Sequence, residues 1–258
     1  MIAGLKSEFR KLFTVRSTYI LMALALAYMI LFDFYVVGWK SGAHTMIVGG
    51  LHNPQFLMIG VTRAGGIVAP VLFSSIIAVL LMAHEYRYST IMYTLTSSNS
   101  RSKTLLAKII TVTTFSVIFS VLLMVLAPLL VLLGIHTHHL KLANQVFFYR
   151  EFFLRVLFYG WAYPMIGVVL AIFFRNIIAS VLALFLLPVT IEPLIALLLN
   201  NNQQQYLPFT ALVGVLNNGL INLGPGTISS ARSAVTVMVY LIIAWIVAWY
   251  IFLKRDAG

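Results

Sequence analysis

The stretch FFRNIIAS, residues 173–180, decides how many helices the chain forms. Without a turn there, the apolar residues on both sides would make one helix about twice as long as the roughly 20 residues that cross a bilayer. Arg175 and Asn176 are adjacent polar residues in the middle of this run, and they favour a tight turn. The sequence therefore predicts two membrane-spanning helices here, at residues 152–174 and 177–199.

Four other segments are apolar over about the length that a spanning helix needs. They comprise residues 18–37, 62–83, 104–134 and 233–253. The 104–134 segment is long enough to tilt in the membrane or to break near Pro128. Together with the two helices around Arg175 this makes six, and we expect an all-α membrane protein in which residues 1–258 form a single transmembrane domain.

The composition agrees with a membrane protein. Hydrophobic residues make up 61% of the 258 residues and charged residues only 9%, whereas an ordinary soluble domain has about 25% charged residues. The net charge of +11 does not indicate nucleic-acid binding, because Lys and Arg stand singly beside apolar segments and form no basic stripe with interleaved aromatics. The absence of cysteine excludes disulfides and thiolate metal sites. We expect a multi-pass protein of the cell membrane that contacts lipid and no nucleic acid.

The distribution of Lys and Arg predicts that both termini lie in the cytoplasm, because cytoplasmic loops of membrane proteins carry an excess of basic residues. With that orientation eleven basic residues are cytoplasmic: Lys6, Arg10, Lys11, Arg16, Arg87, Arg101, Lys103, Lys108, Arg175, Lys254 and Arg255. Six are on the other side: Lys40, Arg63, Lys141, Arg150, Arg155 and Arg232.

Residues 1–17 have the pattern of an amphipathic helix that lies flat at the cytoplasmic interface. Their apolar positions recur at helical spacing: Ile2, Leu5, Phe9, Leu12 and Phe13. We expect this face to lie in the acyl boundary, and the cations Lys6, Arg10 and Lys11 to approach anionic head groups. A plain basic flank that sets the topology is the alternative. On the outer side, the broken apolar sequence of residues 200–232 predicts a loop with short re-entrant or interfacial helices.

Patterns that carry catalysis are incomplete in this sequence. Neither GxxxxGK[ST], which cradles phosphates, nor GxSxG, which exposes a serine nucleophile, occurs. His136, His138 and His139 lack the accompanying carboxylates and the i, i+4 spacing of a zinc site. Glu151 and Arg155 match only part of an intramembrane glutamate protease motif, because the second acid is missing. We therefore expect no enzymatic activity, and an intramembrane hydrolase is a disfavoured alternative.

Two carboxylates lie in or beside the apolar spans. Asp33 is near the outer end of the first span, where water reaches it. Glu192 is deeper, in the fifth span between Pro188 and Pro193. An ionisable group within a membrane is costly and is by default a functional candidate. Glu192 is therefore the candidate for contact with a substrate pathway or with a partner helix.

One polar segment interrupts the chain between the second and third spans. Residues 84–108, HEYRYSTIMYTLTSSNSRSKTLLAK, hold five of the 23 formally charged residues. The Ser and Asn residues at 97–100 favour a turn and a helix start. The predicted order is therefore helix end, short interfacial helix, turn and next helix. Ile91 and Leu95 are one helical turn apart and form an apolar edge for a partner.

The same segment resembles the cytoplasmic loop in permease subunits of type-2 ABC exporters, specifically the small six-helix kind. That loop has the pattern E-x-R-x-G-T, an apolar stretch with Leu, then P-x-S-R and a basic helix start ending in A-K. The residues that fit are Glu85, Arg87, Thr90, Ile91, Leu95, Ser100, Arg101, Ala107 and Lys108. Ser89 stands for the usual Gly, and Ser98 or Asn99 for the usual Pro. The likeness extends to KSEFRKLFTVRSTY, YLPFTAL and FLKRDAG, and so covers nearly the whole chain.

The resemblance implies a permease subunit that exports a drug, peptide or lipid-like substrate. Two permease subunits, identical or homologous, would form the pathway, and separate ABC ATP-binding subunits would bind ATP and Mg, so this chain needs no cofactor of its own. Residues 84–103 would be the coupling segment that contacts the ATPase through Glu85, Arg87, Thr90, Ile91, Leu95 and Arg101. One alternative is a nonenzymatic assembly or immunity factor that binds another membrane protein. For the segment itself, the alternative is a loop that binds anionic lipid.

Overall fold

The computed structural model describes residues 2–31, 68–87, 101–137, 150–216 and 229–254, and this part of the chain contains helices and no strand. Five of the helices are long and apolar enough to cross a membrane, and the bent pair of helices at the amino-terminus makes up to six spans. The prediction of an all-α membrane protein is confirmed for the described residues.

The first four predicted spans each contain a helix, and those in the second to fourth are long. α1 (Ile2–Thr14) precedes α2 (Arg16–Met29), and these are followed by α6 (Val68–Arg87), α8 (Arg101–Thr137) and α9 (Arg150–Phe174). Of the two possibilities for the 104–134 span, a tilt or a break near Pro128, the break does not occur, since α8 continues through Pro128. Proline is tolerated inside membrane helices because neighbouring groups satisfy the backbone carbonyl that it leaves free.

The fifth span is distorted, and short helices follow it. α10 (Ile177–Leu186) passes through one stretch of π-helix, η3 (Leu187–Ile191), into α11 (Glu192–Leu197). Pro188 lies in η3 and Pro193 in α11, and each removes a backbone donor from the helix. The remaining described helices are α12 (Asn201–Gln204), α13 (Pro208–Gly214) and the last span, α14 (Ser230–Lys254).

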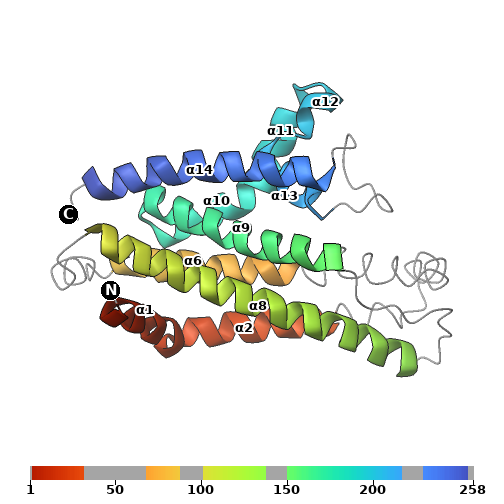
Figure 1. Cartoon of the computed structure of the whole chain (residues 1–258), viewed down its shortest axis with the longest axis horizontal. Helices are drawn as coiled ribbons and strands as arrows, with labels where there is room; N and C mark the ends of the chain where they lie inside the picture. Colours follow the sequence, from red (N-terminus) through yellow and green to blue (C-terminus); the bar gives the residue numbers. More distant parts are fainter. Residues whose placement is uncertain (1, 32–67, 88–100, 138–149, 217–228, 255–258) are drawn as a thin grey trace.

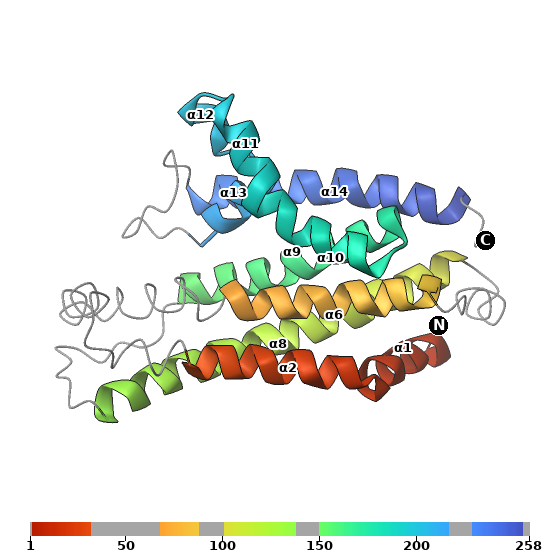
Figure 2. The same cartoon turned by 180° about the vertical axis from the view of Figure 1, so that it is seen from behind.

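The long helices lie side by side, and α1 and the carboxyl end of α14 are at the same end of the bundle (Figure 1, Figure 2). The end of α6, the start of α8 and the α9–α10 turn are at this end too. We call it the basic end, because the sequence places Lys or Arg in each of these five parts. α12 and α13 lie toward the opposite end. The cytoplasmic location of the basic end stays a prediction.

α9 is the central helix of the bundle. It packs against α6, α8, α10 and α14. Of its membrane-spanning stretch, 72% is buried inside the bundle. Two glycines allow this close contact: an added Cβ at Gly160 would lie 1.9 Å from Ser120 Oγ on α8, and one at Gly167 would lie 2.9 Å from the Ser75 carbonyl oxygen on α6. Lipid provides no hydrophobic drive for the association of membrane helices, so close packing has to hold them together. Small residues at the contact allow the backbones to approach closely.

The stretch FFRNIIAS forms the predicted turn. Arg175 has a positive φ of 52°, the left-handed conformation in which many helices end. The Asn176 side-chain oxygen accepts the Ile178 N–H at 2.8 Å and the Ala179 N–H at 3.3 Å, and so caps α10. The Arg175 guanidinium lies over the Tyr86 ring, 5.3 Å from its centroid. The turn therefore also joins α9 to the end of α6.

α1 is helical as expected, but its contacts differ from those of a helix lying freely at the interface. It is bent by 63° from α2 and packs against α8. Leu12 is buried with Ile77 of α6 and Phe115 of α8, whereas Phe13 is 48% exposed. Lys11 was expected to face lipid head groups, yet it contacts two carboxylates of the protein. α1 is thus part of the bundle.

We expect Gly167→Val to weaken the contact between α9 and α6. The new side chain would meet the Ser75 carbonyl and Val79 Cγ2, at 2.9 and 3.2 Å from its Cβ, and backbone at this distance cannot yield without moving a helix. Overpacking of this kind costs about 1–3 kcal/mol. The unfolding temperature of the purified protein in detergent should fall. Gly4→Val is the control, since nothing lies within 4 Å of a Cβ there; equal effects of both changes would contradict the packing argument.

Candidate functional site

Four charged side chains from three helices meet at the basic end of the bundle. Glu8 and Lys11 lie one turn apart on α1, Glu85 lies near the end of α6, and Lys108 lies two turns into α8. We call these four residues the charge cluster. They bring together positions as far apart as 74 and 100 residues in the sequence.

The two lysines connect the two carboxylates. Lys11 Nζ lies 2.7 Å from Glu8 Oε1 and 2.6 Å from Glu85 Oε1. Lys108 Nζ lies 2.8 Å from Glu8 Oε2 and 2.9 Å from Glu85 Oε1. Each carboxylate therefore contacts both ammonium groups. Such short charge-assisted contacts are stronger than hydrogen bonds between neutral groups.

Three members of the charge cluster are buried. Lys108 is 1% exposed, Glu8 2% and Glu85 4%, while the Lys11 side chain is 36% exposed. Removing a charge from water costs several kcal/mol unless a partner compensates it. Two acids and two bases give the cluster a formal charge of zero, so mutual pairing is what allows it to be buried. The cluster is best understood as a clamp that holds α1, α6 and α8 together.

Three of the predicted site residues lie in or near this clamp. Glu85 is a member of it, Arg87 is the last residue of α6, and Arg101 is the first residue of α8. Thr90, Ile91 and Leu95 lie outside the described residues. The clamp therefore holds both helices that border residues 88–100. Glu85 makes its ion pairs within the chain, and its buried Oε2 has no hydrogen-bond partner among the described residues.

The sequence analysis did not identify Glu8 as a site residue. It also did not predict that Lys11 and Lys108 each pair with Glu8 and Glu85. Glu8 is one of only six acidic residues in the chain, and its distance of three positions from Lys11 is that of a helical ion pair. The scarcity of acids was thus a usable signal that Glu8 has a defined partner. The identity of the distant partners was not visible, because no local pattern connects α1 with Glu85 or Lys108.

Glu192 has its partners on α13. Its side chain is 5% exposed, and its carboxylate accepts the backbone N–H groups of Phe209, at 2.8 Å, and of Thr210. The first N–H groups of a helix have no acceptor within the helix, and a negative charge is favourable at that end. Glu192 thus caps α13 from a distant position in the sequence.

His136, Glu151 and Arg155 are not members of the charge cluster. His136 is exposed in the last turn of α8, at the end of that helix opposite to Lys108. His138, His139 and Asp33 lie outside the described residues. Glu151 and Arg155 both belong to the start of α9.

Comparison with known proteins identifies a family for most of the chain. Residues 4–191, which are most of the chain and include all members of the charge cluster, match the family described as ABC-2 family transporter protein. None of the curated proteins that were compared with the chain matches it.

We expect Lys108→Met to destabilise the protein strongly. The substitution keeps the length of the side chain but leaves Glu8 and Glu85 sharing only Lys11. Breaking a buried ion pair on one side costs about 3–5 kcal/mol. Lys103→Met is the matched control, because Lys103 is exposed on the same helix and surface changes are usually within about 0.5 kcal/mol. Chemical denaturation in detergent would measure both.

A double substitution separates charge pairing from packing. Glu8→Met together with Lys108→Met leaves the Lys11–Glu85 pair as the remaining neutral unit. The double variant should be more stable than Lys108→Met alone, because no buried charge lacks a partner. A double variant that is at least as destabilised as the sum of the two single variants would contradict this account of the clamp.

Proposed function

Because the chain belongs to the ABC-2 family of transporter proteins and is a permease subunit of an ABC transporter, we propose that it exports a drug, peptide or lipid-like substrate. The energy comes from ATP hydrolysis in a separate ATP-binding subunit, which also holds Mg. Supporting this division, the sequence has membrane spans but no phosphate-binding GxxxxGK[ST] motif. A second permease subunit, identical or homologous, completes the pathway in the cell membrane.

In this proposal, residues 84–103 couple the ATPase to the spans. Ile91 and Leu95 provide the apolar docking edge, and Arg87, Thr90 and Arg101 orient the ATPase by polar contacts. Charged contacts of this kind give an interface its orientation more than its affinity. The partner-facing surface lies on the basic end, which is cytoplasmic in this proposal.

The charge cluster is the observation that carries the proposed coupling. It fixes the end of α6 and the start of α8, the two helices that border the coupling segment, to α1. A displacement of the segment is then transmitted to three helices together, since packed helices move as rigid bodies. Glu85 acts in this proposal through Lys11 and Lys108, as a positioning residue. Glu192 acts as a helix-partner contact, which its two acceptor bonds to α13 support.

We expect an ATP-binding subunit to co-purify with this chain and to be released when the docking edge is made charged. Ile91→Glu with Leu95→Glu would place two carboxylates in an apolar contact, where unpaired charge is strongly unfavourable. The amount of ATPase recovered with the tagged chain is the measurement. Ser98→Ala in the same segment is the control. If no ATPase is recovered with the unaltered chain, an assembly or immunity factor becomes the better function.

A second prediction concerns coupling rather than docking. Glu85→Gln and Arg101→Ala should each leave ATPase activity in the assembled complex but lower export, because Glu85 is a member of the clamp that carries force to the spans, and Arg101 orients the ATPase in this proposal. The ratio of substrate exported to ATP hydrolysed in vesicles is the measurement, on complex that remains assembled. Lys103→Met should leave the ratio unchanged. Normal ratios in both variants would remove residues 84–103 from the coupling role.

A further inference from the structure

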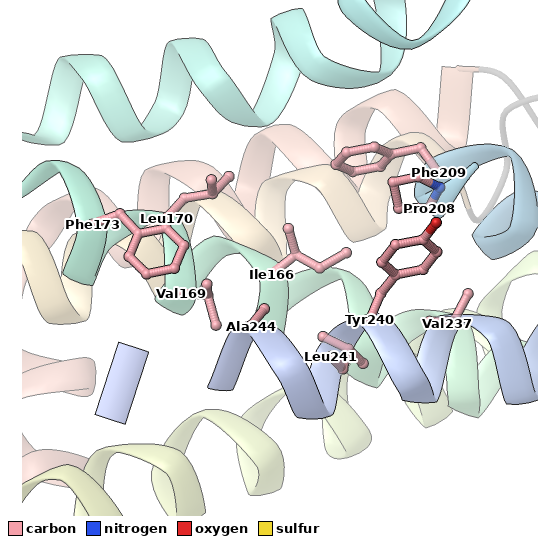
Figure 3. A pocket seen from close by; sticks show the side chains of 10 residues that line it. All are labelled: Ile166, Val169, Leu170, Phe173, Pro208, Phe209, Val237, Tyr240, Leu241 and Ala244. Carbon is pink, nitrogen blue, oxygen red and sulfur yellow. The ribbon is translucent and has the colours of Figure 1, made fainter. Parts of the chain in front are cut away.

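An apolar pocket lies between α9, α13 and α14 (Figure 3). Its volume is about 190 Å³. Ile166 and Phe173 line it from α9, Phe209 from α13, and Tyr240 and Ala244 from α14. An apolar cavity of about 150 Å³ is known to stay free of water and to accept benzene. The space is therefore large enough for a hydrocarbon group and unsuited to water.

α13 forms one side of the pocket through Pro208 and Phe209. Three contacts hold this helix in place. Glu192 accepts the backbone N–H of Phe209, and the Tyr163 ring meets the Phe209 ring edge-on, with centroids 5.8 Å apart. At the other end of α13, an added Cβ on Gly214 would lie 2.8 Å from Ser233 Oγ of α14, so the two helices approach closely there. These contacts attach α13 to α11, α9 and α14, so the position of Phe209 in the lining is set by the surrounding structure.

The walls of the pocket determine what enters it. α9 and α14 are both spans, and the lining side chains are apolar except for the Tyr240 hydroxyl, which is directed toward Pro208 in Figure 3. Pro208 has no backbone N–H to donate. An opening between two spans faces the hydrocarbon part of the membrane, where the abundant mobile molecules are lipids. Unfilled apolar space also costs stability in proportion to its volume.

We propose that this pocket binds one acyl chain of a membrane lipid, which enters sideways between α9 and α14. The chain restores the van der Waals contacts that the lining lacks when the space is empty. The head group stays outside the pocket, so the site selects for hydrocarbon rather than for head-group charge. This inference does not depend on the proposed export, and its test needs neither an ATPase nor a known substrate.

The test uses the full chain in vesicles of phosphatidylcholine that contain a small fraction of phosphatidylcholine with a photoreactive diazirine on one acyl chain. After illumination, mass spectrometry locates the adducts. We expect labelling of Tyr240 to exceed that of Tyr250, which is on the same helix and outside the pocket lining. The two tyrosines are exposed to similar extents, 44% and 56%, but Tyr250 lies at the charged end of α14, under the Lys254 ammonium. The excess at Tyr240 is therefore assigned to the pocket only by the part of it that is lost when the pocket is filled.

Filling the pocket distinguishes it from the general lipid surface. Ala244→Phe should abolish the excess at Tyr240, whereas Ile246→Phe, at a 65% exposed position of α14 outside the lining, should preserve it. The unfolding temperature shows whether the filled variant is folded. Equal labelling of both tyrosines in the unaltered chain would overturn the proposal even if Ala244→Phe fails to fold. So would an excess at Tyr240 that survives in a folded Ala244→Phe variant.

Discussion

Buried charge is the constraint on which the basic end of this bundle depends. Glu8, Glu85 and Lys108 are removed from water, and each would be strongly unfavourable without the others. They meet because the 63° bend between α1 and α2 places α1 against α8. The burial of Leu12 with Ile77 and Phe115 adds an apolar contact beside the charges. α1 therefore supplies the partners of buried charges on α6 and α8. A basic flank that only sets topology would not make these contacts.

A second set of contacts runs from α9 toward the opposite end. Gly160 and Gly167 bring α9 close to α8 and α6, and the turn at Arg175 and Asn176 then sets where α10 begins. α10 leads through η3 to Glu192, and Glu192 holds α13 beside the pocket between α9 and α14. A change in the packing of α9 is thus expected to alter the pocket as well as the helix pairs.

The sequence was sufficient for the helices and for the turn between the fourth and fifth spans. Hydropathy predicts spans because a backbone in lipid must satisfy its own hydrogen bonds, and Asn176 caps α10 by a local interaction. Pro128 did not indicate where a helix ends, because the effect of a proline inside a membrane helix depends on the neighbouring helices. The charge cluster and the Glu192 cap could not be predicted, because they join positions that are distant in sequence. For Lys11 the helical periodicity was right, but the partner was protein rather than lipid.

The pairing inside the clamp also decides the charge that the basic end presents outward. Glu8 and Glu85 are two of the six acidic residues in the chain. Both are paired with the buried Lys108, so they do not balance the exposed cations. Lys6, Arg10, Arg16, Lys103 and Lys254 are exposed at the same end. Cations that are not balanced locally produce a positive field, which attracts anionic surfaces at distances up to about 8–10 Å at physiological salt. Lipid head groups meet this condition, and so would an acidic surface of the proposed ATPase partner. The charge distribution that predicts cytoplasmic termini therefore also agrees with docking of that partner beside residues 84–103, the proposed coupling segment.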